Sequence, residues 1–386
     1  MKRTLGHALI IIGAALIVIA VLLPTFLVPR LRVIPLDTVS DTVTEVRDGT
    51  LLDSSQLGKN EPTPNRKNDP RCKAETDEEK RDLPVHCFIN DKTPMQSKRH
   101  VEIEEPADDK IATLQVGTTL LRDDREEPKN LINATLDRIT VDRSTAYPVD
   151  DPISSVAINA PQGGSDTKPP TFTRPGIQYQ FPFGAEKKSY PYFDVQAMRN
   201  FEIDFVGEET QDGVKVYKYS MTIPPQNLYE SLTEHFTRDG RKLTEADKSS
   251  LASMRLSFPA HKWGLEGDDD VELDRYYTNV RTVRVEPTSG VIVNGTEEMF
   301  MFYAKDDKEA EEIASKAGRE KEAKEQNRTA MKYTAQWDEG SKGRQMDRAK
   351  EARKSLTIGG TVAPWVLGIL GLVLIVIGFR VRSKSA

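Results

Sequence analysis

Residues 201–223 read FEIDFVGEETQDGVKVYKYSMTI, and this stretch decides the fold class. Apolar and polar side chains alternate on both sides of Asp212-Gly213, a dipeptide that favours a tight turn between antiparallel strands. A similar alternation, enriched in Val, Ile, Tyr, Phe and Thr, runs from Val101 to Ile223. Because a period of two indicates half-buried strands, the sequence predicts an α+β, β-rich domain built on a curved antiparallel sheet.

Two helical regions interrupt this predicted sheet. Residues 226–254 carry apolar side chains at helical spacing, with a break at 238–241 and Thr244 as the N-cap of the second helix. Residues 306–355 are rich in Ala, Glu, Lys and Arg, and we expect a charged juxtamembrane helix there. Such a helix is either a spacer or a site for a partner.

Two segments near the ends are free of Asp, Glu, Lys and Arg, at residues 5–28 and 357–379. At 1.5 Å per residue the first is about 36 Å long, enough to span the hydrocarbon core of a bilayer. We expect transmembrane helices at 5–28 and 358–379. The first is too long for a signal peptide and lacks a small-residue cleavage site, so we expect an uncleaved anchor. Glycines in the second would allow close approach of another helix.

The charges around these segments predict the topology. The whole chain carries a formal net charge of −6, and the six basic residues beyond its middle carry +6, so residues 31–357 carry −12. Basic residues at both ends place residues 1–4 and 380–386 in the cytoplasm and residues 31–355 outside the plasma membrane. An acidic domain is also a poor binder of nucleic acid.

Residues 54–100 are highly charged and rich in proline, which predicts a flexible insertion. They contain the two cysteines of the chain, Cys72 and Cys87. An even pair fits one disulfide in an oxidising compartment, and two free thiols are the alternative. The disulfide would close a loop of about 15 residues, be worth up to ~3 kcal/mol and, lying in an insertion, be dispensable for the fold.

The sequence carries no recognised catalytic signature. GxSxG, P-loop, HExxH and GxGxxG motifs are absent, and the five histidines lack the spacing of metal ligands. The acidic run Asp268 to Asp270 lacks the ligand spacing of a calcium loop. We therefore expect a protein that is not an enzyme and that needs neither a cofactor nor a metal.

An aromatic block is the other unusual feature. Residues 180–194 read QFPFGAEKKSYPYFD. These rings either fill the core on one face of the sheet or form the wall of an apolar groove that admits an acyl chain. Lys187 and Lys188 are candidate rim groups. The candidate groove residues are Phe181, Phe183, Tyr190, Tyr192, Phe193 and Trp263.

Three stretches make the chain recognisable: LLPTFLVPRLRVIPLDTV at 22–39, the aromatic block at 180–194, and FVGEETQDGVKVYKY at 205–219. They resemble the actinobacterial porin PorA family, which includes the mycobacterial polar growth factor A. The resemblance implies an envelope protein of mycolic-acid bacteria. It also implies a role in trafficking trehalose monomycolate during polar growth, beside the mycolate-lipid exporter of the inner membrane. The family offers no established catalytic residues.

Three functions follow as hypotheses. The first is lipid binding and handover by a domain held at the membrane, with a membrane lipid or mycolate glycolipid and the exporter as partners. The second is a scaffold that recruits envelope or division proteins. The third is the pore that the family name suggests, which we disfavour because a β-barrel pore has no helical spans. The sequence leaves the identity of the lipid, the partner surface and the oligomeric state open.

Overall fold

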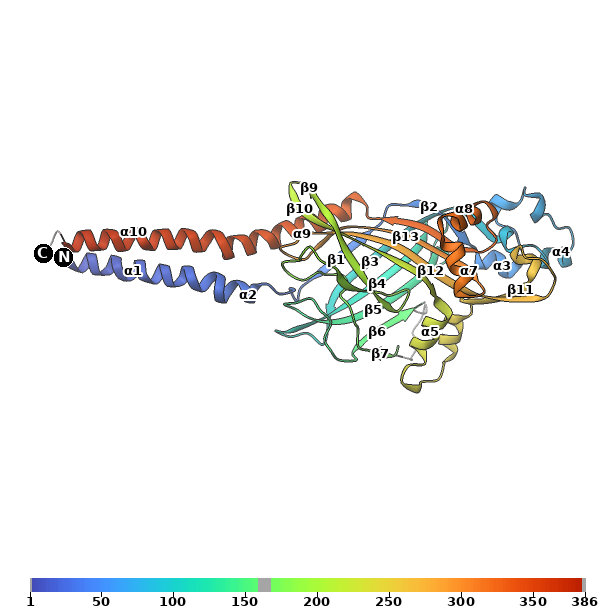
Figure 1. Ribbon diagram of the computed structural model, residues 1–386, viewed down its shortest axis with the longest axis horizontal. Helices are drawn as coiled ribbons and strands as arrows, with labels where there is room; N and C mark the ends of the chain where they lie inside the picture. The colour runs from blue at the N-terminus through green and yellow to red at the C-terminus, as the bar shows by residue number, and fades with distance from the viewer. Residues whose placement is uncertain (1, 159–167, 384–386) are drawn as a thin grey trace.

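The computed structural model describes residues 2–158 and 168–383. Two long helices lie side by side and project from a β-rich domain, with both chain ends at the far tip of the helix pair (Figure 1). The predicted α+β class and the antiparallel sheet are confirmed. Met1 and residues 384–386, which belong to the predicted cytoplasmic ends, lie outside the described residues.

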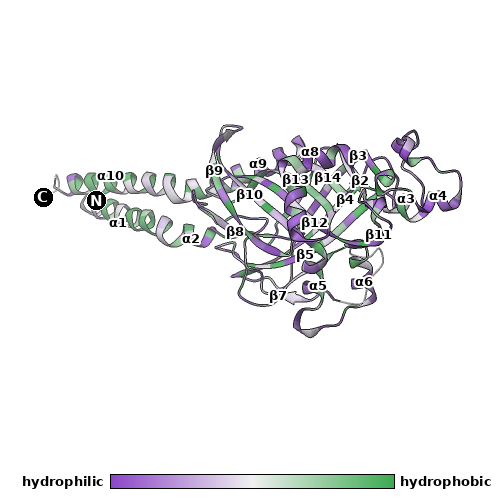
Figure 2. Ribbon diagram, turned by 45° about the vertical axis from the view of Figure 1, so that its right-hand side comes forward, coloured by the Kyte–Doolittle hydropathy of each residue, from purple (hydrophilic) through white to green (hydrophobic). Residues whose placement is uncertain are grey.

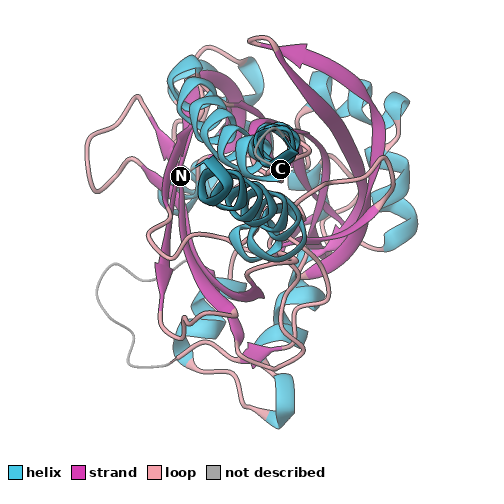
Figure 3. Ribbon diagram, turned by 90° about the vertical axis from the view of Figure 1, so that its left-hand side faces the viewer, coloured by secondary structure: helices cyan, strands magenta, loops and turns pink. Residues whose placement is uncertain are grey.

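The strands form one curved antiparallel sheet that is not closed on itself. Its order is β7-β6-β5-β4-β3-β2-β14-β13-β12-β10-β9-β8, while β1 pairs with β3 and β11 with β12. Viewed along the terminal helices, strands curve round both sides of the domain (Figure 3). The strands are β1 (Val39–Val43), β2 (Arg47–Leu52), β3 (Ile89–Glu104), β4 (Ile111–Arg122), β5 (Leu131–Asp142), β6 (Ser154–Ile158), β7 (Thr171–Phe172), β8 (Tyr190–Asp194), β9 (Arg199–Gln211), β10 (Val214–Asn227), β11 (Arg255–Pro259), β12 (Asp270–Val285), β13 (Ile292–Ala304) and β14 (Thr329–Gln336).

The predicted hairpin is present as β9 and β10. Asp212 and Gly213 form its turn, with φ of 48° and 74°, as a two-residue turn with two left-handed residues requires. The alternation at 177–183 was misleading. This segment is irregular: Tyr179 has a φ of 66°, and a single bridge joins Ile177 to Tyr192.

The helical region at 226–254 is confirmed as α5 (Leu228–Phe236) and α6 (Glu245–Leu251). Between them lies a single turn of 3-10 helix at Arg238–Gly240, in which Asp239 is left-handed. Thr244 caps α6 as predicted, because its hydroxyl accepts from the Asp247 amide while the Asp247 carboxylate accepts from the Thr244 amide.

The insertion at 54–100 differs from the prediction. Residues 89–100 belong to the long strand β3, and the part before them folds into α3 (Ser54–Lys59), α4 (Asp77–Arg81) and short 3-10 turns. Cys72 and Cys87 form the predicted disulfide, and both are buried in the main core. The buried apolar residues of this region, Leu83, Val85 and Phe88, belong to the same main core as the disulfide.

The region at 306–355 is not one charged helix. It forms α7 (Asp307–Ala314), α8 (Lys316–Glu325), the strand β14 and α9 (Glu339–Thr357). β14 lies near the middle of the sheet, between β2 and β13. Its apolar residues Met331, Tyr333 and Ala335 face the core and alternate with exposed Lys332 and Thr334. This period of two was hidden inside a charged, helix-favouring composition.

The terminal helices are long and apolar enough to cross a membrane, at Thr4–Phe26 and within Glu339–Ser383. The first comprises α1 (Lys2–Leu22), a π-helical turn (Leu23–Leu27) and α2 (Val28–Leu31). The second continues from α9 through a π-helical turn (Ile358–Val362) into α10 (Ala363–Ser383). Hydrophobic residues dominate both helices along the pair (Figure 2).

Glycines set the distance between α1 and α10. A Cβ atom added to Gly13 would lie 2.5 Å from the Gly371 carbonyl oxygen, and one added to Gly6 would lie 2.9 Å from that of Gly378. The two glycines are seven residues apart in each helix, so the close contacts lie one above the other. The helix that was expected to approach the glycines of the second segment is therefore the first helix of the same chain.

Candidate functional site

The curved sheet encloses a cavity of about 900 Å³. Strands from β1 to β6 and β12 to β14 contribute to its wall, and α5 covers part of it. Its middle is apolar, with side chains from six strands and from α5: Leu51, Leu120, Leu131, Ile132, Ile158, Leu228, Leu232, Met299, Met301 and Met331.

The mouth of the cavity lies beside α3 and the β4–β5 connection. The lining residues that the structure describes as exposed are Ser54, Ser55, Lys59 and Lys129; the others are buried or half-buried. In Figure 1, α3 lies at the end of the domain far from the terminal helices. The cavity therefore opens away from those helices.

A buried cluster of charged residues lies next to the mouth. The carboxylate of Asp53 caps α3 by accepting from the amides of Ser55 and Gln56. Its other oxygen accepts from Arg122 Nη1 at 2.7 Å and from Arg125. Burial alone would raise the pKa of Asp53, but the two guanidinium groups lower it on balance. Asp53 is thus ionised and already neutralised.

A second charged cluster lies at the deep end of the cavity. Arg281 Nη2 lies 3.0 Å from a carboxylate oxygen of Glu297 and 3.0 Å from one of Asp194. Nearby, Asp137 pairs with Arg174 and accepts a hydrogen bond from the Tyr179 hydroxyl at 2.6 Å. Burial, reinforced by the charge of Asp137, raises the pKa of Tyr179 well above its ordinary value, so the hydroxyl stays protonated.

Three buried polar atoms on the cavity wall have no hydrogen-bond partner among the described residues. They are Gln56 Oε1, Asn133 Oδ1 and Arg281 Nη1. Buried polar atoms in folded proteins are nearly always paired, so these three residues give the wall hydrogen-bonding groups that the described residues leave unused. Together with the apolar middle, they define a site for a molecule that is partly polar and partly apolar.

The aromatic candidates lie elsewhere, in the core. Phe181, Tyr190 and Tyr219 form a ring cluster with centroids 4.7–5.8 Å apart. Trp263 packs at a tilt against Phe258, with ring centroids 5.3 Å apart, and donates from Nε1 to the Val271 carbonyl oxygen at 3.2 Å. The residues that line the large cavity do not include the six groove candidates: Phe181, Phe183, Tyr190, Tyr192, Phe193 and Trp263.

The physical reason is that segment 177–183 folds over β8, so the rings of the block pack against one another. Phe183 packs against a small separate cluster around Ile34. Tyr192 does line a second, much smaller cavity of about 70 Å³, next to Arg281. Lys187 and Lys188, proposed as rim groups, instead form exposed ion pairs with Glu208 and Glu186.

Sequence reasoning missed the residues that do line the cavity. A usable signal exists in β13, where Glu297, Met299 and Met301 share one face of the strand and all line the cavity. A carboxylate on a predicted inward face is unfavourable in a plain core, because a buried charge needs partners. Such a residue indicates either an internal ion pair or a polar cavity, and here both are present.

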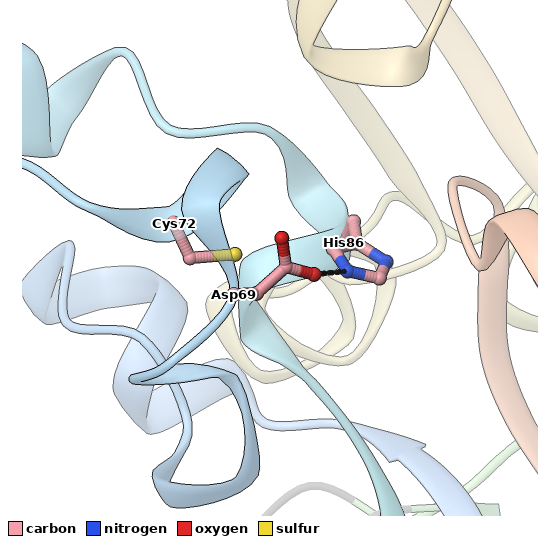
Figure 4. A group of neighbouring side chains, drawn as sticks. All are labelled: Asp69, Cys72 and His86. Carbon is pink, nitrogen blue, oxygen red and sulfur yellow. Dashed lines mark hydrogen bonds and ion pairs between the residues drawn. The ribbon is translucent and has the colours of Figure 1, made fainter.

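Asp69, Cys72 and His86 form a compact group in which the potential metal-ligating atoms lie within 4.8 Å of one another (Figure 4). The Cys72 sulfur is bonded to Cys87 and is not a thiolate. His86 Nε2 lies 2.8 Å from Asp69 Oδ2, and its Nδ1 lies 3.0 Å from the Glu325 carbonyl oxygen. The group thus links the disulfide region to α8 and serves the fold.

Fold and site together define a class: a β-rich domain with an internal amphipathic cavity, carried on two apolar terminal helices. The profile of the family described as Porin PorA matches residues 5–380, and the chain belongs to this family. A "Porin PorA" of Corynebacterium amycolatum is 98% identical over the full length of both chains. A "Porin PorA" of Corynebacterium resistens is 46% identical, covering all of this chain and 97% of its own.

Proposed function

We propose that this protein is a non-enzymatic lipid-binding factor of the cell envelope, anchored in the plasma membrane by α1 and α10. Both termini then face the cytoplasm, and the β-rich domain lies outside. The observation that carries the proposal is the cavity of about 900 Å³ inside the curved sheet.

The wall of this cavity suits an amphiphile. Ligand sites are concave and mostly apolar, with a few polar groups that fix the orientation of the ligand. Leu228, Leu232 and Met331 offer apolar contact to an acyl chain, while Arg281 and Asn133 carry the unpartnered polar atoms. A chain buried along such a wall would gain roughly 25 cal/mol per Å² of apolar surface removed from water.

The helix pair supports retention of the first helix as an anchor. Gly6 and Gly13 contact the backbone of α10 so closely that α1 is an integral part of the pair. Small residues at such crossings are typical of helices that associate within a membrane. The family resemblance adds trehalose monomycolate as the candidate lipid and the mycolate-lipid exporter as the candidate partner.

Native mass spectrometry of the full chain, purified in mild detergent and incubated with an acylated trehalose lipid, tests the proposal. We expect retained lipid in the native chain and at least a tenfold loss in Met299→Trp, which fills the apolar middle. Val206→Trp is the matched control, because Val206 is 53% exposed on β9 and is not among the residues that line the cavity. Lipid retained equally by all three chains, or by none, would contradict the proposal.

A second candidate is pore formation, which the description of the family favours. The purified chain in a planar bilayer tests it directly: discrete conductance steps would support a pore. Lipid retention without conductance would favour lipid binding. A chain that shows neither, but crosslinks to envelope proteins in cells, would favour the scaffold hypothesis.

A further inference from the structure

The charges of the cavity wall differ in sign from those of the domain around it. The lining contains seven basic residues: Lys59, Arg99, Arg122, Arg125, Lys129, Arg275 and Arg281. It contains three acidic residues: Asp53, Asp137 and Glu297. The domain as a whole, residues 31–357, carries a net charge of −12. An acidic protein therefore surrounds a basic cavity.

Each of the three acidic residues of the wall already forms an ion pair. Asp53 pairs with Arg122 and Arg125, Asp137 with Arg174, and Glu297 with Arg281. Burial alone would raise the pKa of Glu297, but the charges of Arg281 and Arg99 outweigh it and lower the pKa. Each acid is thus a member of an internal ion pair, which offsets its negative charge at the cavity wall.

Three of the seven basic residues form no ion pair among the described residues. Arg275 is half-buried and donates to the Tyr303 hydroxyl, whereas the other two lie at the mouth. Lys59, on α3, and Lys129, before β5, are exposed and form no ion pair among the described residues. The acidic residues of the same β4–β5 connection, from Asp123 to Glu127, are exposed and lie off the cavity wall. The half-buried Gln56 stands beside the two lysines with one end of its amide unpartnered.

We propose that the mouth is a head-group site for an anionic amphiphile, in which Lys59 and Lys129 hold a carboxylate or phosphate while the acyl chain enters the apolar middle. This inference rests on the proposed lipid-binding function and specifies its ligand class. It shifts the candidate head group from a neutral sugar to an anion. Ammonium groups bind such oxygens through charge-assisted hydrogen bonds.

Displacement of a fluorescent fatty acid, cis-parinaric acid, from the full chain in mild detergent tests the inference at pH 7. The competitors are hexadecanoate, hexadecyl phosphate, the neutral hexadecanol and inorganic phosphate. We expect both anionic lipids to bind about tenfold more tightly than hexadecanol, and the preference to shrink as salt is added. Binding by inorganic phosphate alone, without the acyl anions, would overturn the assignment to a lipid.

The variant is Lys59→Gln/Lys129→Gln, and the control is Lys67→Gln/Lys92→Gln. The control pair is also exposed, forms no ion pair with any residue that the structure describes, and lies off the cavity wall. We expect only the first variant to lose the preference for anions, with its affinity for hexadecanol unchanged. Equal binding of acid and alcohol in the native chain, or a preference that survives in the first variant, would overturn the head-group site and leave lipid binding intact. Failure of every acyl compound to displace the probe would instead overturn the proposed function.

Discussion

His235 shows how burial decides the behaviour of a single residue. Its side chain lies on the covered face of α5, 1% exposed, and its Nε2 donates to the Val156 carbonyl oxygen at 3.1 Å. The ring of Phe172 packs edge-on against it, with centroids 5.6 Å apart. Burial lowers the pKa of His235 to about 4, because the charged imidazolium would lose its hydration.

This pKa predicts an acid-sensitive stability. His235 is neutral in the folded chain down to about pH 4, whereas in the unfolded chain it takes up a proton near pH 6.5. Burial of the neutral His235 therefore contributes its full stabilisation above pH 6.5. As the pH falls towards 4, the free energy of unfolding decreases by about 3 kcal/mol.

Denaturant titrations at pH 7, 5.5 and 4.5 check the prediction. His235→Phe removes the titrating group, so it should show a flatter pH dependence than the native chain. His100→Asn is the contrasting variant: the hydrogen bond to Asp41 raises the pKa of His100, so loss of the imidazole should make the acid destabilisation slightly steeper rather than flatter. Identical slopes for the native chain and His235→Phe would show that His235 is not the sensor.

At this scale the sequence revealed residue types but not their surroundings. The aromatic block was visible, and so was the alternative that it only fills the core, which is what the structure shows for most of its rings. The cavity residues were not predictable, because Lys59, Arg99, Arg281 and Glu297 come from segments far apart in the sequence. A period-two pattern gives the face on which a residue lies, not the neighbours that it meets across a curved sheet.

Among the elements, the pair α1 and α10 depends most on small side chains. Gly13 and Gly371 lie so close that a side chain on either would collide with the backbone of the other helix. Gly368 is different, because a Cβ there would lie 3.9 Å from the Cβ of Ala20. This distance suits a disulfide, which joins Cβ atoms 3.5–4.5 Å apart.

The pair can therefore be monitored by a crosslink. Ala20→Cys/Gly368→Cys in native membranes should form a disulfide between α1 and α10, detected as a linked peptide by mass spectrometry. Adding Gly13→Leu should reduce the yield roughly tenfold, since close packing drives association of helices in a membrane. Adding Ile11→Leu, at an outward position that is 69% exposed, should leave the yield unchanged. An unchanged yield in the Gly13→Leu chain would contradict the crossing.

Elements with strong patterns were predictable, and those in biased composition were not. The hairpin β9–β10, the helices α5 and α6 and the apolar terminal helices follow from alternation, capping and hydropathy. β14 was missed because Thr329–Gln336 lies between Lys- and Glu-rich helices. The start of β3 was missed because Asn90, Asp91 and Lys92 continue the polar character of the insertion.

For the whole molecule, the order of the strands ties the two ends of the chain together. β2, at residues 47–52, and β14, at residues 329–336, are neighbours near the middle of the sheet. Met331 lies opposite Leu51, and the Tyr333 hydroxyl donates to the Met95 carbonyl oxygen at 3.1 Å. Without β14 the sheet would separate into two parts, each with a new exposed edge.

A truncation series tests this dependence. A chain that ends at residue 328 should lose cooperative unfolding and become sensitive to protease, because β2 and β13 lose their shared partner. A chain that ends at residue 357 keeps β14 and α9, and Met346 and Ala349 of α9 still pack on β10 and β13. It should unfold in one transition near that of the full chain. Cooperative unfolding of the shorter chain would show that the sheet holds together without β14.

The central position of β14 also has a consequence for biosynthesis. A ribosome makes β2 early, and nearly 280 residues follow before its neighbour β14 exists. If the domain is exported, its amino-terminal half reaches the outside long before the strand that completes the middle of the sheet. The early half must therefore wait with an open edge until translation is almost finished, and chaperones outside the membrane would have to protect that edge during the delay.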